Sequence, residues 1–233
     1  MTVLEECEAL LHRTVNQQGV DYKQLKADGL LEHVAESFAT QKWPQSAASL
    51  AFWLNAYNLL TLTLICRNYP LKSINDLNRL QPLALAAVAK KTVWDTETFN
   101  IGPRSYTLND IEQKIIRPKF KEPRIHAALV CAAKSCPPLR DELYRDSLLD
   151  SQLDQQMQAW LRDKNKNRFN AKKGVLHLSP IFLWYRKDFT AGGMNVKKWA
   201  TRYLSEADVA AIGVQKKKLK IRYLGYDWGL NDV

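Results

Sequence analysis

Cys136 and His126 are the residues of this chain whose types best suit nucleophilic catalysis. Pro137 fits the first position of a helix, so we predict a helix over 139–144 with Cys136 as its N-cap. A thiol there faces unpaired backbone N–H groups and the positive end of the helix dipole, which would lower its pKa. Cys136 is therefore our candidate nucleophile, and His126 is our candidate general base.

A carboxylate would complete this arrangement by orienting the imidazole of His126. The run Thr107-Leu-Asn-Asp110 has the form of a capping box and predicts a helix that Pro118 ends. Glu112 would lie in its first turns, within reach of His126. The alternative is structural, with Cys136 as a small buried cap and His126 as a core histidine whose hydrogen bonds are satisfied.

Two asparagines occupy an apolar stretch. Asn55 and Asn58 share one side of a helix predicted over 46–67, which is apolar on most faces and therefore buried. An unpaired buried amide costs about 1–3 kcal/mol, so each asparagine either braces a neighbouring segment or belongs to a site. In a site, either amide would stabilise an oxyanion.

Other arrangements of these residue types remain open. His126, Cys131 and Cys136 have ligand types that zinc accepts, in an H-x4-C-x4-C pattern. We favour a strand over 124–132, which would point His126 and Cys131 to opposite faces, so we predict no metal and no cofactor. His177 follows the cysteines in the order used by papain-like proteases, although a partly exposed strand position is the simpler interpretation.

The surrounding elements predict an α+β fold, a helix-rich single domain over 1–233 around a small, mainly antiparallel sheet. The hydrophobic content of 46% supports a sizeable core. The predicted helices cover 3–14, 22–38, 46–67, 82–93 and 147–163, followed by two short helices near the C-terminus. The predicted strands are two hairpins, over 99–101 with 105–107 and 168–170 with 175–178, and a last strand at 220–226.

Charge and hydropathy limit the partners. The net charge of +10 favours solubility, and it favours an anionic substrate if the basic residues rim the cleft. Aromatic residues do not alternate with the basic clusters, so we do not expect nucleic-acid binding. Polar residues interrupt the apolar run 50–66, so no transmembrane segment is predicted. Because 1–6 carries acidic residues, we expect a cytoplasmic protein, or a periplasmic one if an export signal precedes this numbering.

Six motifs lie along the chain as recognisable units, namely Ala51-Phe-Trp-Leu-Asn-Ala-Tyr-Asn58, Ser105-Tyr-Thr-Leu-Asn-Asp-Ile-Glu112, Pro123-Arg-Ile-His-Ala-Ala-Leu-Val-Cys131, Ser135-Cys-Pro-Pro138, Trp184-Tyr185 and Asp227-Trp228. Together they resemble the domain of unknown function 547 family. The resemblance covers nearly the whole chain in order, and His177 lies outside it. It implies a set of polar or reactive signature positions, namely Asn55, Asn58, Glu112, Arg124, His126, Cys131 and Cys136.

These observations lead to two hypotheses. In the first, the protein is a cysteine-dependent hydrolase or transferase acting on an amide or ester, in which Cys136 attacks, His126 is base and then acid, and Glu112 orients His126. Substrate binding or oxyanion stabilisation would fall to Asn55, Asn58, Arg124 and Cys131. In the second, the signature residues form a structural polar core of a non-catalytic module that binds a protein or a polyanion.

Overall fold

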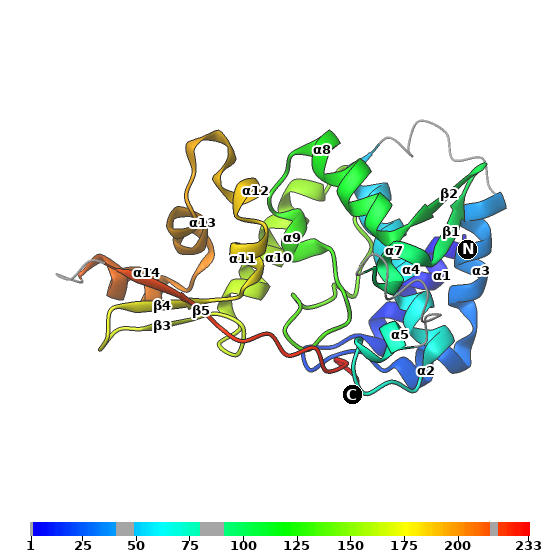
Figure 1. Ribbon diagram of the computed structural model, residues 1–233, viewed down its shortest axis with the longest axis horizontal. Helices are drawn as coiled ribbons and strands as arrows, with labels where there is room; N and C mark the ends of the chain where they lie inside the picture. Colours follow the sequence, from blue (N-terminus) through cyan, green and yellow to red (C-terminus); the bar gives the residue numbers. More distant parts are fainter. Residues whose placement is uncertain (1, 41–48, 80–90, 215–218) are drawn as a thin grey trace.

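The computed structural model describes residues 2–40, 49–79, 91–214 and 219–233. Figure 1 shows an elongated molecule, with the N-terminal helices and first hairpin at one end and the second sheet at the other. The N-terminal elements are α1 (Val3–Thr14), α2 (Tyr22–Asp28), α3 (Leu30–Thr40), α4 (Leu50–Asn68), α5 (Asp76–Arg79), α7 (Val93–Thr96), β1 (Thr98–Ile101) and β2 (Arg104–Thr107).

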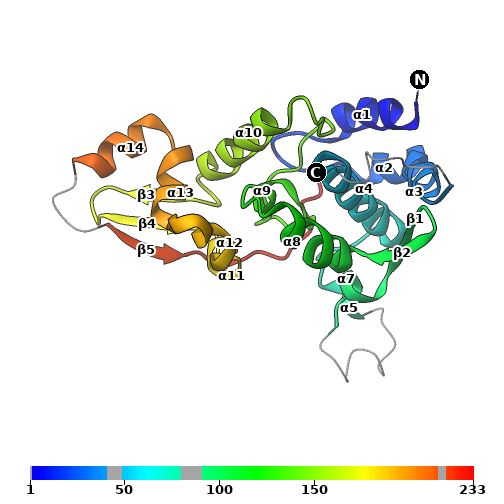
Figure 2. The same cartoon turned by 90° about the horizontal axis from the view of Figure 1, so that it is seen from above.

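The later elements begin with a π-helix and end with a strand. They are the π-helix η2 (Asp110–Ile116), α8 (Arg117–Phe120), α9 (Ile125–Ala128), α10 (Leu149–Arg162), β3 (Arg168–Asn170), β4 (Val175–Leu178), α11 (Ile181–Trp184), α12 (Arg186–Thr190), the 3-10 helix η3 (Ala191–Gly193), α13 (Val196–Tyr203), α14 (Glu206–Gly213) and β5 (Lys220–Tyr223). Helices α8 to α10 lie between the two ends of the molecule (Figure 2).

Helix α4 is the centre of the N-terminal half. It begins at the cap residue Ser49, whose side chain accepts a hydrogen bond from the backbone N–H of Phe52. Nearly every side chain between Leu50 and Cys66 is buried, against α2, α3 and η2, which confirms the predicted buried helix. No helix within the described ranges is long and apolar enough to cross a membrane.

The strands form two small sheets. Strands β1 and β2 make an antiparallel hairpin in which Thr98 faces Thr107. In the second sheet, β4 pairs antiparallel with β3 and parallel with β5. Both predicted hairpins and the helix-rich α+β fold are therefore confirmed.

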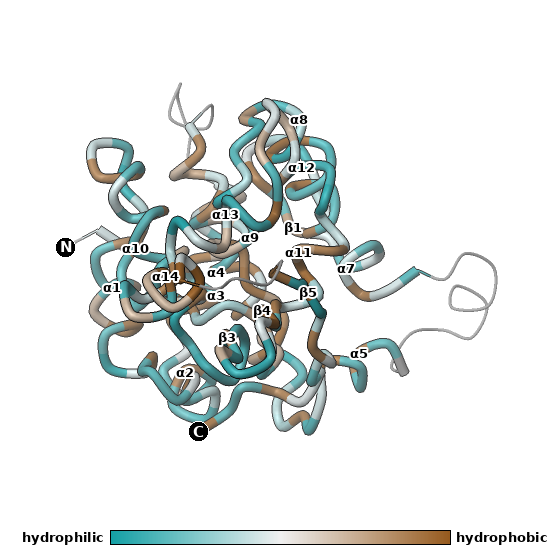
Figure 3. Tube along the Cα trace, turned by 90° about the vertical axis from the view of Figure 1, so that its left-hand side faces the viewer, coloured by the Kyte–Doolittle hydropathy of each residue, from teal (hydrophilic) through white to brown (hydrophobic). Residues whose placement is uncertain are grey.

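The buried hydrophobic side chains form two clusters. The first surrounds α4, and the second joins α10 to α13 with the second sheet, around Trp160, Phe182 and Phe189. Tyr226 packs against both clusters. Hydrophobic positions gather toward the middle of the molecule, and the peripheral turns are mostly hydrophilic (Figure 3).

The segment after β5 connects the two ends of the molecule. It runs from the second sheet back toward α5 (Figures 1 and 2) and pairs with three earlier segments, near Val20, Ser73 and Ala133. Gly19 permits the first of these contacts, because a Cβ atom there would lie 2.1 Å from the carbonyl oxygen of Asn231. The C-terminal residues are thus part of the N-terminal half of the fold.

The strand predicted over 124–132 is wrong, because this run begins as helix α9 and becomes extended only from Leu129. The run is short and apolar, a pattern that suits either element. Packing decides the outcome, since α9 lies against α10 and Arg124 forms ion pairs with Asp150 and Asp154 of that helix.

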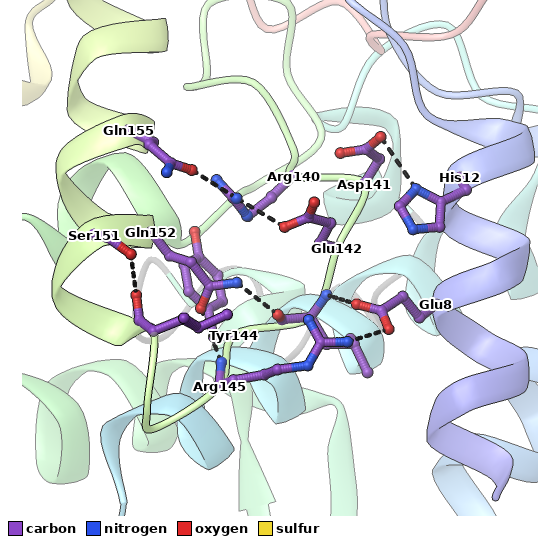
Figure 4. A network of polar contacts seen from close by, with 12 residues as sticks. Glu8, His12, Arg140, Asp141, Glu142, Tyr144, Arg145, Ser151, Gln152 and Gln155 are labelled. Atoms are coloured by element: carbon purple, nitrogen blue, oxygen red, sulfur yellow. Dashed lines mark hydrogen bonds and ion pairs between the residues drawn. The ribbon is translucent and has the colours of Figure 1, made fainter.

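The helix predicted over 139–144 is also wrong, so Cys136 caps no helix. Pro137 and Pro138 both lack an N–H, and the second proline pushes the first toward the extended region. The loop that follows is held by side chains from two helices (Figure 4). Glu8 of α1 accepts from the backbone N–H of Leu143 at 3.0 Å, and Gln152 of α10 donates to its carbonyl at 2.9 Å.

Two helix boundaries differ from the prediction as well. The helix expected over 22–38 is interrupted by Gly29, which adopts the left-handed conformation with a φ of 77°. Pro118 does not end its helix, because it lies in the first turn of α8, where its missing N–H is not required. The helix expected over 82–93 lies largely outside the described residues.

Candidate functional site

A cavity of about 330 Å³ lies where the two hydrophobic clusters meet. Four of the residues singled out in the sequence line it together, namely Glu112, His126, Cys131 and Cys136. Six of the other lining residues are aromatic, namely Tyr57, Trp94, Trp184, Tyr185, Tyr226 and Trp228. None of the described residues that line the cavity is a lysine or an arginine.

His126 is fixed by a carboxylate that the sequence did not indicate. Its Nε2 lies 2.8 Å from Oδ2 of Asp188 in α12, and Arg117 pairs with both oxygens of the same carboxylate at 2.7 and 3.0 Å. The hydrogen bond from His126 and the pairing with Arg117 hold the pKa of Asp188 well below its usual range. Because an ionised carboxylate only accepts, Nε2 carries the hydrogen of this contact.

The imidazole is also held by aromatic packing. The ring of Tyr185 stacks on that of His126 with a centroid distance of 3.9 Å, and the guanidinium of Arg117 lies 5.0 Å from the centre of the Tyr185 ring. Only 2% of the side chain of His126 is exposed. Asp188 and Tyr185 thus fix the orientation of His126, and Arg117 holds both of these residues in place. A general acid or base needs such a fixed orientation.

The two cysteines lie in direct contact. Their Sγ atoms are 3.1 Å apart, and both thiols are free. The backbone N–H of Cys131 donates to Sγ of Cys136 at 3.0 Å, and the hydroxyl of Tyr226 lies 3.3 Å from Sγ of Cys131. Cys136 is buried and Cys131 is partly exposed to the cavity.

These contacts change the acidity of the pair in opposite directions. The hydrogen bond between Cys131 and Cys136, with a further one between Cys131 and Tyr226, lowers the pKa of the Cys131 thiol to about 7. Burial raises the pKa of Cys136 above its usual value, since the site offers little solvation for a second thiolate. The predicted drop in pKa therefore falls on Cys131, through side-chain hydrogen bonds and not through a helix dipole.

The cysteine loop, residues 131–136, is held by the C-terminal segment. Ala132 has a φ of 64°, which is unusual for a residue with a side chain and lets the loop turn back on itself. The N–H of Lys134 donates to the carbonyl of Gly229 at 2.8 Å, and the N–H of Asn231 donates to that of Ala132 at 3.0 Å. The same segment places Tyr226 beside the sulfur atoms.

Glu112 approaches the cavity from the π-helix η2. In this wider turn the N–H of Arg117 donates to the carbonyl of Glu112, five residues earlier. The predicted capping contacts are confirmed, since Thr107 and Asp110 exchange hydrogen bonds between side chain and backbone. Burial and the Glu112 carboxylate raise the pKa of Tyr185. Glu112 thus faces Tyr185, while the contact to Nε2 of His126 comes from Asp188.

Asn58 and Asn55 lie outside the cavity and brace backbone segments. Asn58 donates to the carbonyl of Ala128 at 2.9 Å and accepts from the N–H of Val130 at 3.1 Å, within the segment that joins His126 to Cys131. Asn55 binds the N–H and the carbonyl of Tyr144 in the same way, both at 2.8 Å. Their amides are therefore paired with backbone groups and are not directed at an oxyanion.

Arg124 and His177 also lie away from the cavity. Arg124 pairs with Glu122, Asp150 and Asp154, and these contacts raise its pKa. His177 lies on β4 opposite Arg168, and its pKa is lowered by burial and by nearby cations. No cluster of three or more histidine, cysteine or acidic side chains suited to a metal occurs within the ranges that the structure describes.

Asp188 and Tyr226 are the site residues that the sequence reasoning missed. They lie 62 and 95 positions from the side chains they contact, so no local spacing indicates them. Two family motifs lie close to them in the sequence and could have drawn attention to them. Trp184-Tyr185 ends three positions before Asp188, and Asp227-Trp228 directly follows Tyr226.

The fold and the cavity define a helix-rich α+β protein with a thiol pair and a held histidine facing an aromatic pocket. The chain belongs to the family described as "Protein of unknown function, DUF547", whose model matches residues 40–161, more than half of the chain. This confirms the resemblance stated from the motifs. No match was found among curated proteins or among solved structures. The matched region includes His126 and both cavity cysteines.

Proposed function

We propose that the protein is a thiol-dependent hydrolase or transferase that acts on an amide or ester bond. Cys131 is the nucleophile, Cys136 stabilises its thiolate, and His126 transfers protons. The observation that carries the proposal is the contact of Sγ of Cys131 with the thiol of Cys136 and the hydroxyl of Tyr226, in the cavity that His126 also lines. Both groups can donate a hydrogen bond to Cys131 once it is a thiolate, which only accepts. This revises the initial hypothesis, in which Cys136 attacked.

The choice of Cys131 rests on ionisation and access. The thiolate is the reactive form of cysteine, and a pKa of about 7 leaves a large part of Cys131 ionised at neutral pH. Cys136 is only 3% exposed and its pKa is raised, so it serves better as a donor than as an attacking group. A thiol with a pKa near the ambient pH combines a high thiolate fraction with good nucleophilicity.

The reaction would proceed in two steps. It would start from the Cys131 thiolate and a His126 ring that carries a proton on both nitrogens. The thiolate attacks the carbonyl carbon, and the bond to the leaving oxygen or nitrogen breaks as Nδ1 of His126 donates its proton to that atom. Nδ1 then removes a proton from water, or from another acceptor, and the resulting nucleophile releases the acyl group and restores the thiolate. Asp188 keeps the proton on Nε2 throughout, and the charge on Asp188 stabilises the imidazolium.

The test is to trap the acyl intermediate. We expect p-nitrophenyl acetate to acetylate Cys131, detected by mass spectrometry on the tryptic peptide 125–134, and Cys131→Ala to abolish this product. His126→Ala should slow release of the acetyl group by about 10²–10⁴-fold. His12→Ala is the matched control, because His12 pairs with Asp141 on the surface.

Absence of acetylation at Cys131, or equal rates in the His126 and His12 variants, would remove the catalytic proposal. The non-catalytic binding module would then become the better hypothesis, and the cavity would be interpreted as a structural feature or a ligand pocket.

A further inference from the structure

We propose that Cys131 and Cys136 form a dithiol that reacts with hydroperoxides and closes to an intramolecular disulfide. This would be a second chemistry of the same loop, and it stands on the contact between the sulfur atoms whether or not the protein is a hydrolase. The substrate class is a small hydroperoxide such as hydrogen peroxide.

The first argument is distance. The Sγ atoms are 3.1 Å apart, whereas a disulfide bond is about 2.0 Å long, so closing the bond requires a movement of about 1 Å. The contact spans only the short loop 131–136, which limits the entropy lost on closure. The hydrogen bonds that join Ala132 and Lys134 to the C-terminal segment hold this loop.

The second argument is access. Cys131 lines a cavity of about 330 Å³, which is larger than a peroxide molecule requires, and it is more exposed than Cys136. The hydroxyl of Tyr226, 3.3 Å from Sγ of Cys131, favours the ionised form that peroxides oxidise. Sγ of Cys136 is in contact with Sγ of Cys131, where it can act as the resolving thiol.

The chemistry balances in two steps. The Cys131 thiolate attacks one oxygen of the hydroperoxide, the O–O bond breaks, and the leaving alkoxide or hydroxide takes a proton, which leaves a sulfenic acid on Cys131. The Cys136 thiol then attacks this sulfur, the S–O bond breaks, and water leaves as the disulfide forms. Overall, two thiols are oxidised and one hydroperoxide is reduced to an alcohol, or to water, with release of one water molecule.

The other two cysteines provide an internal reference. Cys7 lies in α1 with no exposed surface, and Cys66 lies near the end of α4 with 5% exposed. Burial raises the pKa of both to about 12, so neither forms thiolate near neutral pH. Oxidation of the protein should therefore consume two of its four thiols.

One consequence rests on the proposed function. A disulfide would remove the thiolate that attacks the acyl donor, so oxidation would switch off acylation and a dithiol reductant would restore it. The oxidation itself is tested without any acyl substrate.

The experiment is peptide mapping after oxidation. The reduced full chain is treated with one equivalent of hydrogen peroxide at pH 7, denatured, alkylated and digested with trypsin, which cuts after Lys134 and so separates the two cysteines. We expect peptides 125–134 and 135–140 joined by a disulfide, alkylation at Cys7 and Cys66, and loss of the cross-link on addition of dithiothreitol.

Two variants sharpen the result. Cys136→Ser should stop at an oxidised Cys131 with no cross-link, and Cys66→Ser should form the cross-link as the unaltered protein does. The inference is overturned if the unaltered protein keeps four alkylatable thiols, or if Cys131 proceeds to sulfinic acid without joining Cys136. Acetylation of the reduced protein is measured separately, so a chain that acetylates without cross-linking loses only this inference, and the reverse result removes only the proposed function.

Discussion

The two pairs of cysteines in this protein occupy opposite kinds of surroundings. Cys7 and Cys66 are enclosed by hydrophobic side chains around α4, and burial raises the pKa of each to about 12. Cys131 is also in contact with the core, yet its pKa falls to about 7 because of its hydrogen bonds with Cys136 and Tyr226. Burial alone therefore does not set the pKa of a thiol in this fold, since side-chain hydrogen bonds at the sulfur atom can outweigh it.

The largest expected effect is the difference in reactivity between Cys131 and Cys66, measured in one sample. At pH 7 a pKa of about 7 against about 12 gives Cys131 roughly 10⁵ times more thiolate than Cys66. A more acidic thiolate is less nucleophilic, so we expect iodoacetamide to label Cys131 at least about 100-fold faster. Peptide mass spectrometry across pH 5–9 provides the rates, and equal rates would refute the difference in surroundings.

A second test separates stability from reactivity. Asn58→Ala leaves the buried carbonyl of Ala128 and the N–H of Val130 unpaired, so we expect the free energy of unfolding to fall by about 1–3 kcal/mol. Because these groups lie in the segment that leads to Cys131, we also expect the rate at which iodoacetamide labels Cys131 to change. Asn55→Ala should cost a similar amount, measured by urea unfolding, without altering that labelling, because Asn55 binds Tyr144. If the labelling rate of Cys131 changed equally in both variants, global stability would control the reactivity of this thiol.

A third test removes one donor from the sulfur atom. Tyr226→Phe deletes the hydroxyl beside Cys131, and we expect its pKa to rise by about 0.5–1 unit, which leaves roughly three- to tenfold less thiolate at pH 6.5. The measurement is the pH profile of iodoacetamide labelling. Tyr203→Phe is the control, since Tyr203 donates to Asp154 far from the thiols, and its profile should match that of the unaltered protein.

The smallest expected effect concerns Asp188, the carboxylate that pairs with His126. The pKa of Asp188 is lower in the folded than in the unfolded chain, so its contribution to stability is complete above about pH 5 and is lost as the pH falls below about 4. Asp188→Asn should therefore cost about 1 kcal/mol at pH 7, a value reduced by partial solvent screening, and progressively less in acid. Urea unfolding at pH 7 and pH 3 measures this, with Asp141→Asn as the control; a loss independent of pH would contradict the assignment.

The sequence predicted the parts of the fold that depend on local patterns. The apolar run of α4 and the turn residues around Gly102 and Gly174 specify a helix and two hairpins through neighbouring residues alone. The sequence also selected four residues that meet in one cavity, because their types are seldom needed for packing.

The sequence could not predict how those four residues are held. The Cys131–Cys136 contact depends on Gly229 and Asn231, and the histidine depends on Asp188, all distant along the chain. The helix predicted after Cys136 does not form, because two successive prolines favour an extended loop there, which side chains of α1 and α10 hold in place. The contacts around the two sulfur atoms thus lower the pKa of Cys131 and not that of Cys136, for which the drop was predicted.

The dependence of the cysteine loop on the C-terminal segment also bears on how the protein is made. Tyr226 lies 90 positions after Cys136, so a ribosome working at about 5–20 residues per second adds it roughly 5–20 s later. During that interval Cys131 lacks the hydroxyl that favours its ionised form, and Ala132 and Lys134 lack their backbone partners. In a nascent chain the contacts of Tyr226, Gly229 and Asn231 with the cysteine loop would therefore form only once synthesis has passed Asn231.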